Sequence, residues 1–219
     1  MARRTVLLLP ALLLPAPVFA DFSGRIGAGY QYAGFDGGPR DGDANLVGAQ
    51  LAFTELQPSG VFGELELQGF IGEGDGEAAS ADDRYAEAAY RFGRLGIADA
   101  GVYTGIGYRH QEAELGEEEL QLAAAYSPFG VQWLGRLWGL ETAARAEAQW
   151  LWQVDGELGA DDEYVDDPGW GLQAVMQVRF TTFGLPLGLD LRYRLLSTEA
   201  EDGETLETQL FGLALSYYL

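Results

Sequence analysis

Large apolar residues alternate with small or polar residues along most of this chain, and this period of two constrains the fold more than any other feature. In residues 185–195, one face carries Leu185, Leu187, Leu189, Leu191, Tyr193 and Leu195, and the other carries Pro186, Gly188, Asp190, Arg192 and Arg194. The same alternation occurs in residues 61–71, 140–152 and 170–180. Side chains that alternate in this way lie on opposite faces of a β-strand. The pattern predicts an all-β protein.

The alternating runs are numerous enough, and long enough, to cross a lipid bilayer as tilted strands. We expect strands at residues 22–33, 45–56, 61–72, 84–92, 100–112, 118–127, 138–154, 170–182, 185–198 and 206–219. The polar faces carry Arg, Glu, Gln and Gly, whereas the outer face of a soluble sandwich favours Lys, Thr and Ser. We therefore predict an up-and-down antiparallel transmembrane β-barrel of about ten strands, with eight strands as the alternative.

The first twenty residues have a different character from the rest. Arg3 and Arg4 precede a short apolar run, and small residues at Val18 and Ala20 stand where a signal peptidase reads. The run is too short and too rich in proline to be a transmembrane helix. We predict a signal peptide in residues 1–20 and a single barrel domain in residues 21–219.

The charge of the chain excludes one large class of partners. Without Arg3 and Arg4, 11 arginines and no lysine remain against 34 acidic residues, a formal charge of −23. Nucleic acid is excluded as a partner, because binding to phosphates needs a basic face. Cysteine is absent, so we expect no disulfide and no metal held by thiolates.

The segments between the predicted strands differ in charge. The connections that follow the first, third, fifth, seventh and ninth strands hold nearly all the excess acid, including FDGGPRDGD and DGELGADDEYVDDPG. The others, QPSG, FGRLGIAD, SPFGVQWLGRLWG and TFGLP, are mostly shorter and carry little acid. This asymmetry predicts acidic loops at the extracellular end and short turns at the periplasmic end.

The chain ends on a regular alternation whose large members are Phe211, Leu213, Leu215, Tyr217 and Leu219. This strand resembles the C-terminal insertion signal of small single-chain bacterial outer-membrane barrels, of the OmpA/OmpX-like or porin-like kind, although that signal usually ends in Phe or Trp. The resemblance implies a position in the cell outer membrane and insertion by the barrel-assembly machinery. It also implies contact with outer-membrane lipid and lipopolysaccharide. We expect the last strand to pair with the first and close the barrel.

The same alternation assigns a set of charged residues to the lumen. Seven basic and seven acidic residues share the inward face: Arg25, Glu64, Glu66, Glu87, Arg91, Arg109, Glu119, Glu141, Arg145, Glu147, Arg179, Asp190, Arg192 and Arg194. Seven glutamines accompany them: Gln31, Gln50, Gln68, Gln121, Gln149, Gln173 and Gln177. Because a ten-stranded barrel is only slightly wider than one filled by its own side chains, we predict a lumen plugged by an Arg/Glu/Gln network. The competing interpretation is a narrow porin-like pore lined by the same groups.

We expect a non-enzymatic protein without a cofactor. The alternative is an outer-membrane hydrolase that acts on lipid or peptide near the extracellular rim, through His110, the only histidine, with Ser197, Glu112 and Glu199. Against it, His110 and Ser197 are expected four strands apart, roughly 19 Å. A third class, a passage for hydrophobic molecules, requires an apolar lumen or a lateral gap.

Acidic residues in one loop are weak candidates for a metal site. Asp161, Asp162, Asp166 and Asp167 belong to the stretch DDEYVDD. Carboxylate oxygens are ligands of Ca²⁺ and Mg²⁺, so the acidic loops are candidates for weak binding of a divalent cation. We prefer a solvated loop, and we expect no built metal centre.

Overall fold

Nearly all of the described chain is β-strand. The computed structural model describes residues 21–36, 42–74, 83–96, 99–115, 118–158, 161–165, 168–199 and 205–219. The predicted signal peptide in residues 1–20 lies outside these residues. The strands are β1 (Asp21–Asp36), β2 (Gly42–Leu56), β3 (Val61–Gly74), β4 (Asp83–Leu95), β5 (Ala100–Leu115), β6 (Glu118–Leu137), β7 (Leu140–Leu158), β8 (Asp161–Val165), β9 (Gly169–Thr182), β10 (Leu185–Glu199) and β11 (Thr205–Tyr218).

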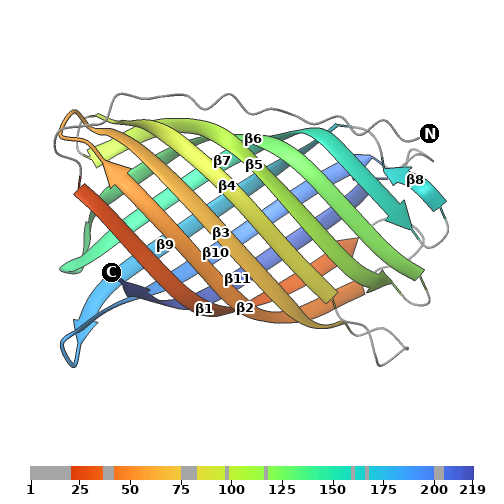
Figure 1. Cartoon of the computed structure of the whole chain (residues 1–219), viewed down its shortest axis with the longest axis horizontal. Helices are drawn as coiled ribbons and strands as arrows, with labels where there is room; N and C mark the ends of the chain where they lie inside the picture. Colours follow the sequence, from red (N-terminus) through yellow and green to blue (C-terminus); the bar gives the residue numbers. More distant parts are fainter. Residues whose placement is uncertain are drawn as a thin grey trace.

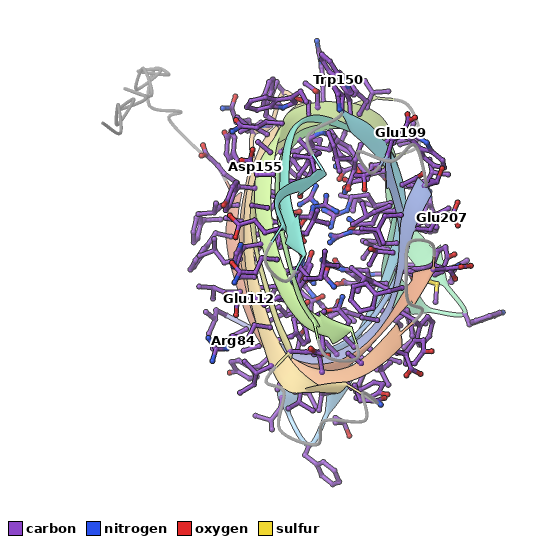
Figure 2. All side chains as sticks on the ribbon, turned by 90° about the vertical axis from the view of Figure 1, so that its right-hand side faces the viewer. Arg84, Glu112, Trp150, Asp155, Glu199 and Glu207 are labelled. Carbon is purple, nitrogen blue, oxygen red and sulfur yellow. The ribbon has the colours of Figure 1, made fainter. Side chains whose placement is uncertain are left out.

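Ten of these strands close into an up-and-down antiparallel barrel, as predicted (Figure 1). Each pairs with its sequence neighbours, except that β7 passes over the short β8 to pair with β9. The last strand pairs with the first over twelve residue pairs, from Arg25 opposite Tyr218 to Asp36 opposite Glu207. This pairing leaves no open edge among the ten strands, which a barrel in lipid requires because hydrocarbon cannot satisfy free backbone groups. Seen along its axis, the barrel is oval in outline (Figure 2).

The two ends of the barrel are different. At one end, on the left of Figure 1, short connections join β2 to β3, β4 to β5, β6 to β7 and β9 to β10; we call this the turn end. At the other, the loop end, lie the longer connections and β8. Two of the turns are two-residue hairpins, Trp138–Gly139 and Phe183–Gly184, in which all four residues have φ between 51° and 83°. Such left-handed turns match the twist of the strands they join.

Most predicted strands are correct to within a few residues, but the connection expected at residues 127–139 is not a loop. Strand β6 continues to Leu137, and only Trp138 and Gly139 form the turn. The prediction was wrong because this stretch is rich in Gly, Pro and Trp and was assigned to a loop. In the structure, however, its residues Phe129 and Val131 keep the alternation and are exposed on the outer face.

The end of β7 contains a bulge that the sequence analysis missed. Tyr126 pairs with Leu151 and Ala125 with Gln153, so that Trp152 is one extra residue in β7. A bulge of one residue exchanges the two faces of the strand beyond it. Consequently Val154 is buried while Gln153 and Asp155 are exposed. Beyond the bulge, β8 pairs with β7 in a region expected to be an irregular acidic loop.

The outer surface of the barrel is a belt of exposed apolar and aromatic side chains. They come from every barrel strand, and include Ile26, Val47, Ile71, Val102, Ile106, Leu172, Leu189, Leu213 and Leu215. Aromatic residues such as Tyr30, Tyr32, Trp150, Phe92 and Phe129 lie toward the two ends, as at the two interfaces of a membrane. No helix in the described part of the chain combines the length and apolarity needed to cross a bilayer.

Candidate functional site: the barrel lumen

The lumen contains a connected set of buried charges, which we call the ion-pair layer. It consists of Arg25, Glu64, Glu66, Glu87, Arg91, Arg145, Glu147, Asp190, Arg192 and Arg194. All ten residues were assigned to the lumen by the alternation of the sequence. Their side chains range from fully buried to 15% exposed, the highest value being that of Glu64. Buried charges are stable only when paired and hydrogen-bonded, and each of these ten groups has at least one partner of opposite charge.

Glu66 is the centre of the layer. Its carboxylate accepts hydrogen bonds from four arginines on four strands: Arg25 at 3.1 Å, Arg91 at 2.9 Å, Arg145 at 3.1 Å, and Arg192. These residues belong to β1, β4, β7 and β10, whereas Glu66 lies on β3. Because β7 and β10 lie across the barrel from β3, these side chains join opposite walls. Glu64, also on β3, accepts a further bond from Arg145.

Glu87 forms a second centre nearer the loop end. Arg194 donates to it at 2.7 Å from β10, and the hydroxyls of Tyr85 and Tyr126 donate from β4 and β6. Gln68 donates to the same carboxylate. The tyrosines were not predicted as part of the network. They stand in the inward register beside Glu87, and their hydroxyls satisfy a carboxylate that would otherwise remain partly unpaired.

Glu147 and Asp190 complete the layer. Arg91 joins Glu147 at 3.0 Å, and Tyr103 donates to the same carboxylate at 2.9 Å. Arg25 lies 3.0 Å from Asp190, which also accepts from Gln50 and Ser216. Two glycines make room for the buried rings, because a Cβ at Gly107 would overlap Tyr126 and a Cβ at Gly130 would overlap Tyr103. Glycine is therefore the residue that fits these inward positions.

Arg109 is buried but differs from the other lumen arginines. Its Nη2 donates to Gln149, and its guanidinium lies 4.2 Å from the centre of the Tyr126 ring. Its Nε and Nη1 have no hydrogen-bond partner, and among the described residues no carboxylate forms an ion pair with it. Arg109 therefore marks the edge of the ion-pair layer that faces the loop end.

Toward the loop end, many apolar side chains line the lumen, and the sequence analysis did not predict this. This apolar layer contains Ala33, Phe35, Ala44, Leu46, Phe70, Tyr85, Ala113, Leu120, Leu122, Tyr126, Leu151, Val154, Leu206 and Leu210. All are buried, and all lie in the halves of their strands nearest the loop end. A signal for it existed at the inward positions of β1, namely Ala33 and Phe35, which continue the register of Arg25 and Gln31.

The first part of β6 corrects one assumption of the prediction. Its apolar residues Leu120 and Leu122 point into the lumen, so Gln121, which was expected inside, lies on the opposite face. The prediction placed apolar faces in lipid, and that rule fails where the lumen itself is apolar. Glu119 is in the same strand, but its side chain lies outside the described set.

Glu141 and Arg179 were predicted to belong to the lumen network, but their side chains are not buried. Their side chains are 53% and 40% exposed, and they lie 3.5 Å apart near the turn end. The strand ends there, so the inward face opens to solvent. Arg136, also exposed, is 3.8 Å from Glu141.

These residues belong to a cavity at the turn end, which we call the vestibule. Its volume is about 680 Å³, and it lies between the short turns and the ion-pair layer. Arg25, Glu64 and Arg145 line it together with Gln177, Arg179 and Tyr218. Arg179 stacks on the Tyr218 ring at 3.8 Å. The ion-pair layer thus forms the inner boundary of a cavity that the sequence did not predict.

The residues of the hydrolase alternative lie in separate places. His110 on β5 contacts Glu112 at 3.0 Å, and Glu112 contacts Arg84 at 3.5 Å on the outside of the barrel (Figure 2). Ser197 lies on β10, separated from β5 by β6, β7 and β9 in the sheet, and it is buried. Its neighbours in register are Trp170 and Glu207.

The weak metal candidates cannot be placed. Asp161 and Asp162 are in β8, where only the backbone is described, and Asp166 and Asp167 lie outside the described residues. Among the side chains that are described, no group of three or more His, Asp or Glu residues is arranged to hold a metal ion.

The predicted C-terminal signal forms the outer face of β11. Phe211, Leu213, Leu215, Tyr217 and Leu219 are each 40–71% exposed. Between them, Ala214 and Ser216 are buried in the lumen. The strand therefore offers large side chains to lipid and small ones to the interior.

No family model matches this chain, and no curated protein does. Among solved structures, the translocator domain of the autotransporter NalP from Neisseria meningitidis aligns with 90% of this chain and 88% of its own, with 6% identity and a TM-score of 0.46. Ail, the attachment invasion locus protein of Yersinia pestis, aligns with 91% of this chain and 99% of its own (11% identity, TM-score 0.34). The β domain of the Bordetella autotransporter BrkA aligns with 90% and 98% (10% identity, TM-score 0.39).

These likenesses say nothing about activity. The architecture is more informative, because in lipid only helices and closed barrels satisfy every backbone group. This barrel is closed, its apolar belt faces outward and its charges face inward. The chain is therefore an outer-membrane β-barrel of the Gram-negative type.

Proposed function

We propose that this protein is a non-enzymatic integral barrel of the outer membrane whose lumen is closed to ions by its own side chains. The observation that carries the proposal is the bonding of Glu66 to arginines from β1, β4, β7 and β10. Side chains that join opposite walls occupy the centre of the lumen. The apolar layer narrows the lumen on the loop-end side of the ion-pair layer.

The interactions that follow from this proposal lie outside the ion-pair layer and the apolar layer. The excess acid of the sequence falls in the predicted extracellular connections, so we assign surface interactions, and any weak binding of divalent cations, to these loops. The apolar belt contacts outer-membrane lipid and lipopolysaccharide. The outer face of β11 is the element that the barrel-assembly machinery reads during insertion.

The conductance of refolded protein in planar bilayers tests this proposal. Wild type is expected to be silent, whereas the double variant Arg192→Ala/Arg194→Ala conducts, because it removes two guanidinium groups that reach across the lumen to Glu66 and Glu87. The matched control is Leu191→Ala/Tyr193→Ala, which changes the outward residues of the same strand and leaves the lumen intact. Steady large single-channel currents from wild type contradict a closed lumen.

A further inference from the structure

The vestibule has the size and position of a ligand site. Its volume of about 680 Å³ lies within the range of roughly 300–1,000 Å³ that is usual for small-molecule sites. The ion-pair layer forms its inner end, so a molecule that enters from the turn end meets Arg25, Glu64 and Arg145 there. In an outer-membrane barrel the short turns face the periplasm, so this cavity is accessible to periplasmic solutes.

The charge of the vestibule is opposite to that of the chain. Four of the 11 arginines that follow the predicted signal peptide line it: Arg25, Arg136, Arg145 and Arg179. Three acidic residues accompany them: Glu64, Asp99 and Glu141. The lining therefore has a formal charge of +1, in a chain whose formal charge is −23 without Arg3 and Arg4. A single negative charge on a ligand would neutralise it.

One buried donor in the lining lacks an acceptor. The Arg145 side chain is 9% exposed, and its two terminal nitrogens bond Glu64 and Glu66. Its Nε is buried and has no hydrogen-bond partner. An unpaired buried donor costs about 1–3 kcal/mol, so an acceptor brought by a ligand would be favoured at this position.

The vestibule has two unlike walls. Leu56, Phe62 and Leu95 come from β2, β3 and β4, and they form the apolar part of one wall, which also carries Thr54 and Glu64. Arg145 and Arg179 come from β7 and β9 on the other side of the barrel. Arg179 is held in place by its stack on Tyr218 and its pair with Glu141. A molecule that fits both walls has an apolar body and an anionic end.

We propose that the vestibule binds a small amphipathic monoanion, of which an aromatic carboxylate is the simplest example. The carboxylate lies toward Arg145 and Arg179, whose planar guanidinium groups suit its geometry. The ring lies against Phe62 and Leu95. Binding requires no opening of the lumen, so this site is independent of whether the barrel conducts.

Equilibrium dialysis of 1-naphthoate against refolded protein tests the site, with empty detergent micelles as the blank. Wild type is expected to bind one equivalent saturably. The Arg179→Gln variant binds about tenfold more weakly, because it loses a charge-assisted hydrogen bond. The neutral analogue 1-naphthamide shows a similar loss on wild type. Arg94→Gln is the matched control, since Arg94 is exposed near the same end and does not line the vestibule.

A second variant keeps the test decisive if Arg179→Gln does not fold. Leu134→Glu places a carboxylate in the lining, which is expected to abolish binding of 1-naphthoate by repulsion. The proposal is overturned if wild type binds no more probe than empty micelles do, or if 1-naphthamide binds as well as 1-naphthoate. It is also overturned if Arg94→Gln weakens binding as much as Arg179→Gln.

Discussion

The two layers of the lumen are stabilised by different physical means. In the ion-pair layer, each carboxylate is held by several partners from distant strands, as Glu66 is by four arginines. In the apolar layer, residues such as Leu120, Leu122 and Leu210 are buried among other apolar side chains. Removing a charge from the first layer leaves its partners unpaired in a buried place. Removing a methyl group from the second leaves a void.

This difference teaches that the two layers respond to different properties of a substitution. The ion-pair layer depends on charge and on hydrogen-bond geometry, so a substitution that removes a charge destabilises it even when the volume of the side chain is preserved. The apolar layer depends on volume and buried area, so an apolar residue of similar size is tolerated. Pairs of variants that separate charge from volume can therefore test the comparison directly.

The largest effect is expected at Glu66. Glu66→Gln keeps the volume but removes the charge shared by four arginines, and it should lower the free energy of unfolding by about 3–5 kcal/mol, the usual cost of breaking a buried ion pair. Glu66→Ala should cost nearly the same. Urea unfolding of protein refolded in lipid vesicles, followed by tryptophan fluorescence, measures both. A loss below about 1 kcal/mol for Glu66→Gln would show that charge does not dominate this layer.

The reverse pattern is expected at Leu122. Leu122→Ala leaves a cavity in the apolar layer and should cost about 2–5 kcal/mol, whereas Leu122→Met nearly preserves the volume and should cost less than about 1.5 kcal/mol. The same unfolding measurement applies. If the two variants were equally destabilising, the layer would not be packed by volume, and the contrast with Glu66 would disappear.

The two layers were not equally predictable from the sequence. The positions of Glu66, Arg91 and Glu147 in the lumen follow from period two, because a charged face cannot lie in lipid. The same period defines two faces in β6 but does not say which is inside, since Leu120 and Leu122 suit lipid as well as an apolar lumen. The extra residue at Trp152 changes the register without any mark in the sequence pattern.

The sequence also did not predict which residues form an ion pair with each charged side chain. Arg145 meets Glu64 and Glu66, which are about eighty residues away, because the strands are tilted and staggered around the barrel. Alternation predicts the face of a side chain but not its height relative to a strand on the opposite wall. For the same reason the vestibule could not be foreseen, because its lining comes from the ends of eight barrel strands.

A smaller effect is expected at Arg109, where the two layers meet. Arg109→Met removes a buried guanidinium that has two nitrogens without a hydrogen-bond partner and, among the described residues, no paired carboxylate. It should therefore change the free energy of unfolding by only about 1 kcal/mol, since buried ionic groups without full pairing contribute little net stability. Arg194→Met is the matched comparison, and it should cost about 3 kcal/mol or more because it leaves Glu87 without its nearest cation. Equal losses would place Arg109 in the ion-pair layer after all.

The smallest effect is expected at the mouth of the vestibule, where ion pairs are exposed. Glu141→Gln breaks contacts with Arg136 and Arg179, whose side chains are 71% and 40% exposed. Exposed pairs contribute about 0–1 kcal/mol, and 1 M salt screens them because the Debye length falls to about 3 Å. The difference in unfolding free energy between wild type and Glu141→Gln should vanish at high salt, while that of Glu66→Gln persists. If salt removed both differences, water and ions would reach Glu66, and the lumen would be a hydrated pore.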